Sequence, residues 1–392
     1  METSTTSYDA ATFLFPNFEN STRMKFYEFV NFLDVAAHPI LDIQLYVSIF
    51  GVVITVFHLF ILTRRSMLTS SVMSIMIGIA ISDWISMITL IESNNKFLDT
   101  KGDACRPSLS LFYLQTYWIS LIVRDLFRRV STWLGLLMAL FRYLVLRFVT
   151  SSGFQTLSEP RFGFFTVIGA FMLSCCFSIF YYFRYEIYQE GTWMPMKNCT
   201  SVDLSTSLPV YGQKHSFLFA YNSGIVGKVY MFLNGVSSKI LPCIFLPILT
   251  LLLIVELKRT EKIRQAKNFS KASSSGTERT TALVIFMAVL FFIVELPIGI
   301  TVALQVSYTD VGYWWLATYV QHFCNTVFAI SASLHCVICF LMSSQYRKTF
   351  GKIFQRQVTF LYYKFEETKI FAEDYIGGEF SSVKSKLAKQ YI

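Results

Sequence analysis

Seven long apolar stretches divide this chain almost from end to end, and the loops between them are too short to hold a domain. The hydrocarbon core of a bilayer is about 30 Å thick, so a helix needs roughly 20 apolar residues to cross it. Lipid favours helices because backbone polar groups must find their partners inside the protein. The stretches run 43–63, 71–91, 117–147, 162–183, 228–255, 281–304 and 313–342. The sequence therefore predicts an all-α membrane protein, a bundle of seven transmembrane helices.

The composition agrees with a lipid environment. Hydrophobic residues make up 54% and charged residues 15% of the 392, a balance outside that of most soluble domains. A basic inner face against anionic lipid accounts for the net charge of +9, so no nucleic acid partner is needed. No H-E-x-x-H helix or Gly-x-Ser-x-Gly elbow is present, and we expect neither an enzyme nor a bound cofactor or metal.

The distribution of Lys and Arg predicts the orientation of the bundle. With the N-terminus outside, the cytoplasmic side holds 21 of the 34 basic residues and the outer side 12, while Lys239 lies within a span. The positive-inside rule therefore favours an outer N-terminus and an inner C-terminus. We expect an extracellular tail at 1–40, the membrane domain at 41–343 and a cytoplasmic segment at 344–392.

Two cytoplasmic segments carry further helical signals. After the seventh span, Tyr346, Phe350, Ile353 and Phe354 recur at helical spacing with cations between them, which indicates a short amphipathic helix at the inner interface. The charged and then flexible stretch 258–278 predicts two helices that extend into the cytosol and are joined by a short loop.

The predicted outer loops contain possible modification sites. Asn20 and Asn198 each begin a tripeptide that matches the N-glycosylation pattern. Cys105 and Cys199 are the two cysteines that fall in these loops. Because the outer compartment is oxidising, one disulfide between them is the natural pairing.

A charge at mid-membrane costs on the order of 3 kcal/mol or more, so each intramembrane ionisable residue is a candidate functional site. Asp83 lies near the middle of the second span and is either a neutral, hydrogen-bonded group or a site for an ion or for switching. Arg142 closes the third span at its inner end, where a snorkelling arginine is also common.

Four ionisable residues occupy the outer part of the third span. Arg124 and Arg128 share one helical face, while Asp125 and Arg129 share the neighbouring face. They lie about 20 to 27 Å from Arg142 at the rise of an α-helix. This distance places them in the outer third of the bundle or at its mouth.

The fifth and sixth spans supply possible partners. Glu295 lies in the middle of the sixth span, and Lys239 lies in the fifth. One reading is an internal pair of Glu295 with Arg128 or Lys239, and the other is a polar floor of a ligand cavity. Both can hold, because a ligand can compete for an internal pair. Pro242 and Pro297 should kink these two helices, which suggests a hinge.

Taken in order, these residues resemble a rhodopsin-like G protein-coupled receptor. The likeness is best to the nematode serpentine receptors of class W, which resemble FMRFamide-type neuropeptide receptors, and it covers roughly residues 40 to 356. The pieces that carry it are His58 to Met67, Ile79 to Asp83, Met138 to Tyr143, Lys239 to Cys243 and Leu341 to Arg347. The resemblance implies a disulfide between Cys105 and Cys199. The positions it implies for switching and G protein coupling are Asp83, Arg142, Tyr143, Pro297, His335 and Cys339.

The chain departs from the family's pattern at several of these places. Phe141 replaces the acidic residue that usually precedes the arginine, and Thr55 replaces the first-span asparagine. Glu295 stands where many receptors carry a tryptophan, and His335 to Cys339 replaces the Asn-Pro-x-x-Tyr pattern. The usual inactive-state lock, sodium site and tyrosine-mediated activation step are therefore not expected in their ordinary form.

The leading hypothesis is a multi-pass plasma-membrane receptor that binds an extracellular ligand, with a neuropeptide favoured, and activates a heterotrimeric G protein. Arginine suits a carboxylate through paired hydrogen bonds, and Glu295 could accept an arginine of the ligand. The alternatives are a chemoreceptor for a small environmental molecule and a ligand-gated channel, which would place the N-terminus inside. The expected ligand-binding residues are Arg124, Asp125, Arg128, Glu295, Gln321 and His322.

Overall fold

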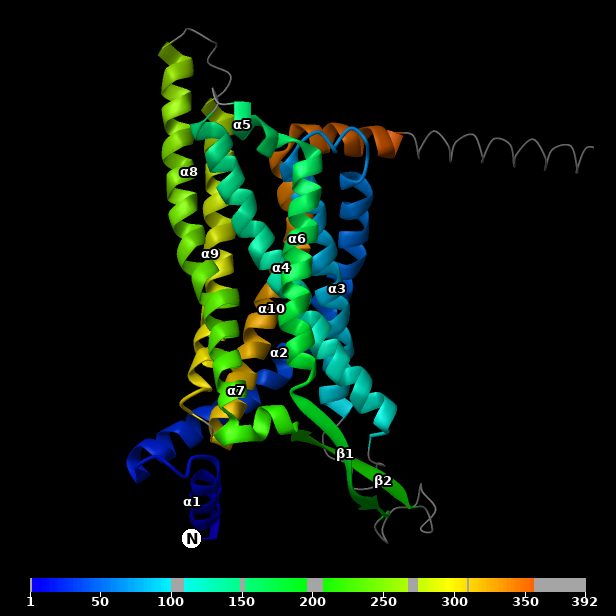
Figure 1. The fold of residues 1–392 in the computed structure, drawn as a ribbon, viewed down its shortest axis with the longest axis vertical. Helices are drawn as coiled ribbons and strands as arrows, with labels where there is room; N and C mark the ends of the chain where they lie inside the picture. Colours follow the sequence, from blue (N-terminus) through cyan, green and yellow to red (C-terminus); the bar gives the residue numbers. More distant parts are fainter. Residues whose placement is uncertain are drawn as a thin grey trace, which may run out of the picture. The chain divides into compact units, whose positions relative to one another are not determined.

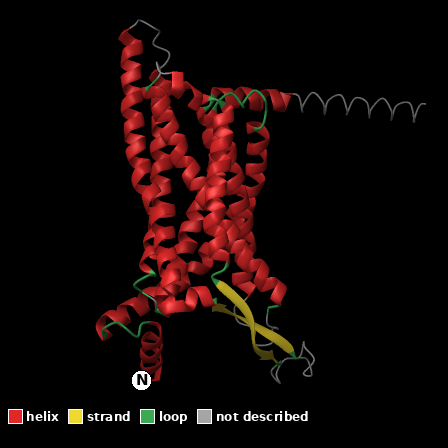
Figure 2. Cartoon of the chain, viewed as in Figure 1, coloured by secondary structure: helices red, strands yellow, loops and turns green. Residues whose placement is uncertain are grey.

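The computed structural model describes most of the chain as helix (Figures 1 and 2). The residues that it describes are 2–99, 109–148, 152–195, 207–266, 274–308 and 310–355. The chain divides into two units, Met1–Met342 and Ser343–Ile392.

The first unit contains the predicted bundle. Over the described residues, six helical segments are long and apolar enough to cross a membrane, and Ala288–Leu304 is a shorter apolar helix. Each predicted span overlaps one of these segments, so the seven-helix interpretation is confirmed. The helices are α2 (Asn20–Leu62), α3 (Ser71–Asp99), α4 (Leu111–Arg147), α6 (Pro160–Tyr182), α7 (Phe217–Gly235), α8 (Leu241–Ala266), α9 (Ser274–Leu304) and α10 (Val311–Met342). The short elements are α1 (Glu2–Leu14), α5 (Ser152–Gln155) and η1 (Thr156–Ser158).

Local sequence explains where two of the spanning helices begin. Ser110 precedes α4 in an extended conformation, and its hydroxyl accepts a hydrogen bond from the Tyr113 backbone N–H. Pro160 begins α6, where its missing N–H leaves no intrahelical bond unmade. Helix α8 ends at Ala266, and helix α9 begins at Ser274. The two helices expected within the stretch 258–278 are therefore present.

The fifth span contains a π-helical turn, η2 (Val236–Ile240), between α7 and α8. Pro242 follows it and cannot donate to the carbonyl of Ser238 four residues earlier, so a local rearrangement of the helix is expected. Gly299 of α9 lies against this turn, because a Cβ on it would come within 2.7 Å of the Lys239 Cβ. Glycine at 299 thus allows α9 to approach the turn that carries Lys239.

A β-hairpin connects the fourth and fifth spans and lies at the same end of the bundle as α1 (Figure 1). Its strands β1 (Tyr185–Trp193) and β2 (Leu208–His215) pair antiparallel, with Tyr185 opposite His215. The sequence interpretation contained no strands in this loop. The hairpin is an addition to the helical bundle rather than a change of fold class.

The first forty residues, expected to be a tail, contain α1 and the first part of α2. Phe15 is only 1% exposed and belongs to a hydrophobic cluster with residues of α2 and with Tyr319 of α10. All five N–H groups of Arg23 are used, and three of their acceptors are the carbonyls of Phe15, Pro16 and Phe18. This segment is therefore folded against the outer end of the bundle.

The second unit begins with a helix over residues 344–355. Phe350 and Phe354 stack on one side of it, with ring centroids 6.3 Å apart. The helix expected after the seventh span is therefore present.

Candidate functional site

A buried ionic network lies where α4, η2, α9 and α10 meet. Arg128 Nη2 is 2.5 Å from Glu295 Oε1, and Lys239 Nζ is 2.8 Å from Glu295 Oε2. Arg128 Nη1 donates to Asn325 Oδ1. The three charged residues are each at most 4% exposed. Both internal pairs considered from the sequence therefore form, and they share one carboxylate.

This network is not fully satisfied. Arg128 Nε and Asn325 Nδ2 are buried without a hydrogen-bond partner in the part of the chain that the structure describes. The Phe328 ring faces Arg128, with the guanidinium carbon 4.8 Å from the ring centroid. Buried donors without acceptors are costly, so this site can gain from a new acceptor.

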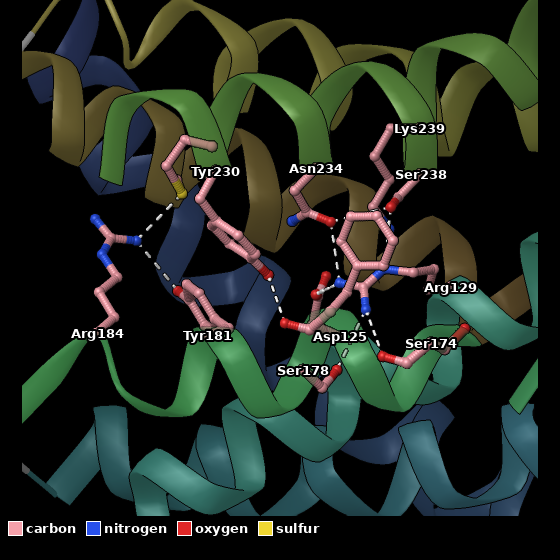
Figure 3. A network of polar contacts seen from close by, with 12 residues as sticks. Asp125, Arg129, Ser174, Ser178, Tyr181, Arg184, Tyr230, Asn234, Ser238 and Lys239 are labelled. Atoms are coloured by element: carbon pink, nitrogen blue, oxygen red, sulfur yellow. Dashed lines mark hydrogen bonds and ion pairs between the residues drawn. The ribbon is translucent and has the colours of Figure 1, made fainter. Parts of the chain in front are cut away.

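Arg129, the next residue, is bound in a different way (Figure 3). It is 1% exposed, and all five of its N–H groups have an acceptor. The network joins α4 to α6, α7 and η2. The acceptors are the carboxylate of Asp125, the amide oxygen of Asn234, the carbonyl of Ser174 and the hydroxyls of Ser178 and Ser238.

Arg124 is the third buried arginine of α4, with 8% of its surface exposed. Its Nη1 donates a 3.2 Å hydrogen bond to Ser93 Oγ of α3. Among the described residues, no carboxylate oxygen lies within 4.0 Å of its guanidinium. Gln321 and His322 of α10 are partly buried, and His322 lies within electrostatic range of Arg124.

The expected ligand-binding residues thus divide between two networks. Arg128 and Glu295 are in direct contact, whereas Asp125 pairs with Arg129 on the neighbouring face of α4. The Asp125 side chain keeps 28% exposure. The expected binding set did not include Asn325, Asn234 and Ser238. The sequence signal that could have identified these three residues is their polarity within otherwise apolar spans.

Asp83 is held by two partners in the middle of the bundle. It is 2% exposed, and its Oδ1 accepts a 2.7 Å hydrogen bond from the Ser131 hydroxyl. His335 Nδ1 of α10 lies 3.1 Å from Asp83 Oδ2. The histidine that replaces the asparagine of the family's seventh-span pattern therefore meets the second-span aspartate directly.

The inner end of α4 lacks the usual acidic partner. Phe141 packs against the Phe162 ring at 5.2 Å, in a cluster with Ile75 and Leu134. No carboxylate oxygen lies within 4.0 Å of Arg142 among the residues described, and Cys339 lies within its electrostatic range. Tyr143 is partly buried beside it. Pro297 lies inside α9, and its role as a hinge stays a prediction.

A different ion pair links the inner ends of two helices. Arg147 Nη1 of α4 lies 3.6 Å from Glu256 Oε2 of α8, and Arg259 Nη1 is 3.6 Å from the other oxygen of the same carboxylate. The Arg147 side chain is 42% exposed, so this tie is weaker than the buried network around Glu295.

Some of the expected modification sites cannot be placed. Cys105, Cys199 and Asn198 lie outside the described residues. Asn20 is exposed at the first turn of α2, and its side-chain oxygen accepts from the Tyr8 hydroxyl at 3.2 Å. Its glycosylation stays a prediction.

The outer end of the Arg129 network continues into an aromatic cluster. Arg184 lies over the rings of Tyr181 and Tyr185, with its guanidinium carbon 5.6 and 4.8 Å from their centroids. Figure 3 shows Arg184 and Tyr181 on the far side of Tyr230 from Arg129. Tyr185 also stacks on His215 at 4.8 Å, so the base of the hairpin is attached to this cluster.

Acidification should loosen the base of the hairpin. Partial burial, together with the charge of Arg184, lowers the pKa of His215 from its ordinary value of 6.5. The attached hairpin thus prefers the neutral ring, and the stability this preference supplies is lost as pH falls below about 6.5. We expect faster cleavage of the hairpin by a pH-tolerant protease at pH 5.5 than at pH 7.5. His215→Phe keeps a stacking ring without the charge and should remove the difference, so an equal difference in that variant would exclude His215 as the cause.

Comparison with known proteins identifies the family to which this chain belongs. A family model described as "Serpentine type 7TM GPCR chemoreceptor Srw" matches residues 42–357. A "G-protein coupled receptor dmsr-1" of Caenorhabditis elegans is 22% identical over 358 residues, which cover 81% of this chain and 68% of the relative. Because the family model covers well over half of the chain, the protein belongs to this serpentine receptor family and is a multi-pass G protein-coupled receptor of the plasma membrane.

Proposed function

We propose that this receptor binds an extracellular peptide in the outer half of its bundle and passes the signal to a heterotrimeric G protein at the inner end. The observation that carries the proposal is the buried network of Arg128, Glu295 and Lys239, which ties α4, η2 and α9 together. Ionisable groups inside a membrane bundle are costly and mark ligand pathways or switches. A ligand that competes for one of these contacts changes how the helices are held.

The proposed binding residues offer charges of both signs. Arg124 and Arg128 can hold an acidic or carbonyl group, and Glu295 can accept a cationic one. Asp125 keeps 28% side-chain exposure even when it is paired with Arg129. Gln321 and His322 would contribute from α10. This mixture suits a peptide with several polar groups better than an apolar odorant.

A small environmental molecule is the second candidate. The family is described as a chemoreceptor family, which favours a ligand of this kind. Such a molecule would use fewer of the charged residues and would not need the outer hairpin or the N-terminal segment.

The G protein is proposed to meet Arg142 and Tyr143 at the inner end of α4. Among the described residues no carboxylate oxygen lies within 4.0 Å of the Arg142 guanidinium, so no ion pair has to be broken before it meets a partner. Asp83 and His335 link α3 to α10 between the two ends. We propose that Asp83 and His335, together with Pro297 and Cys339, transmit the conformational change from the outer network to Arg142.

A ligand screen tests the whole proposal. Cells that express the chain are exposed to a library of peptides and small volatile molecules, and G protein activation is read by a dissociation sensor. We expect activation by a peptide, and Arg142→Ala should reduce it at least tenfold at unchanged surface level and unchanged ligand binding. Exposed Arg161→Ala, at the start of α6, is the matched control and should signal normally. Activation by small molecules alone would favour the second candidate, and a ligand-evoked current without G protein activation would contradict both.

A further inference from the structure

The buried charges in the outer half of the bundle do not balance. Four cationic side chains are at least nine-tenths buried there: Arg124, Arg128, Arg129 and Lys239. The carboxylates within 4.0 Å of these cations, among the described residues, are Asp125 and Glu295. Two positive charges are therefore left without a negative one.

Both carboxylates are already taken. Asp125 is bound to Arg129, and Glu295 is shared by Arg128 and Lys239. Glu92 of α3, next to Ser93, does not come within 4.0 Å of any of the four cations. Among the described residues, no carboxylate oxygen thus lies within 4.0 Å of Arg124.

Arg124 and Arg128 are the two cations with unmet hydrogen-bonding or charge requirements. Arg124 and Arg128 are four residues apart on one face of α4, where like charges repel each other. Among the described residues, Arg128 Nε is buried without an acceptor, and Arg124 donates to the neutral hydroxyl of Ser93. One acceptor anion between the two guanidiniums would supply one of the two missing charges and would accept hydrogen bonds from both side chains.

We propose that the ligand of this receptor presents an acidic group, a carboxylate, that binds between Arg124 and Arg128. This inference rests on the proposed function, because it names the chemistry of a ligand at that site. An arginine fork binds two carboxylate oxygens side by side, which suits both guanidiniums. A chloride ion would share the charge but could not bridge in this way.

The same group would act on the network below it. A carboxylate bound to Arg128 competes with Glu295 Oε1 for the guanidinium, while Glu295 Oε2 keeps its contact with Lys239. The contact between α4 and α9 is then weakened and the contact between η2 and α9 is kept. Because Glu295 lies two residues before Pro297, the change occurs next to the proline of α9.

The experiment uses the full chain in lipid nanodiscs and needs no identified ligand. The apparent melting temperature is followed during titration with sodium acetate, sodium chloride or acetamide, at constant ionic strength in a sulfonate buffer. We expect acetate to raise it by about 2–4 °C at concentrations well above its dissociation constant. The neutral acetamide should have no effect, and chloride should have a smaller effect than acetate.

Two variants decide whether Arg124 is responsible. Arg124→Gln removes an unpaired buried charge, so it should melt at or above the wild-type temperature without acetate and should lose the acetate-dependent rise. Arg184→Gln, which alters an arginine held by tyrosine rings outside the cluster, should keep the rise. An unchanged acetate effect in Arg124→Gln would overturn the assignment, and so would a chloride effect equal to or larger than that of acetate.

This outcome is separable from that of the ligand screen. If no peptide activates the receptor but acetate stabilises it through Arg124, the proposed function fails and the anion site stands. If a peptide activates it, converting the peptide's acidic group to an amide should lower potency at least tenfold in the wild type and less than twofold in Arg124→Gln. Equal loss in both would overturn the proposal.

Discussion

Replacing Glu295 by glutamine should lower the free energy of unfolding of the receptor by roughly 3–5 kcal/mol, the range seen when one partner of a buried ion pair is removed. The effect is large because one carboxylate serves two buried cations, Arg128 and Lys239. Glutamine keeps the shape but leaves both cations without a charge partner within 4.0 Å among the described residues. The apparent melting temperature in nanodiscs measures the loss, since an equilibrium unfolding energy is hard to obtain for such a protein.

A second substitution tests the reason for the loss. In the Glu295→Gln background, Lys239→Met removes one of the two unpaired cations and should recover part of the stability. Lys239→Met alone should destabilise less than Glu295→Gln, since Glu295 then keeps Arg128. Strictly additive losses in the double variant would show that the shared carboxylate is not the cause.

Replacing Arg129 should have the second large effect. Arg129→Met removes the donor of five hydrogen bonds that reach four structural elements, and one of the five acceptors is a carboxylate. We expect a loss of stability of about 3–5 kcal/mol, with a corresponding drop in surface expression. Arg129→Lys keeps the charge near Asp125 but offers three donors in a different geometry, so it should recover only part of the loss.

Arg161→Met is the matched control for this prediction. Arg161 is exposed at the start of α6, so its replacement should change the melting temperature little. A small effect at Arg129, comparable with that at Arg161, would mean that the five hydrogen bonds add no net stability.

The sequence predicted the main features of the site because helical period fixes which side chains share a face. Glu295 was expected to pair with Arg128 or Lys239 from their positions, and the four-residue spacing of Asp125 and Arg129 placed them on one face. Each spanning stretch was also found, since lipid demands a minimum apolar length. These predictions depend on local rules that hold in any bundle.

The parts that were missed depend on contacts between distant segments. The five acceptors of Arg129 come from α4, α6, α7 and η2, and no local pattern states that they converge. The π-helical turn adds a further difficulty. One extra residue in a turn rotates the following side chains by about 100°, so the facing of Lys239 could not be read from an ideal helix.

The folded N-terminal segment was missed for a similar reason. Its Phe15 is buried by residues of α2 and by Tyr319, which is far away in the sequence. Arg23 binds three backbone carbonyls, and such bonds leave no signature in composition. From its polarity alone, such a segment is predicted to be a tail, because the residues that it packs against are distant in the sequence.

The helix α2 continues without a break from this outer segment through the bundle, and Tyr319 of α10 donates a 2.7 Å hydrogen bond to Asp34. An antibody or nanobody that binds the first forty residues would therefore also act on the position of the seventh span. Reagents raised against the amino end are candidate modulators of signalling, and a bulky fusion placed there should be checked for altered activity before it is used as a label.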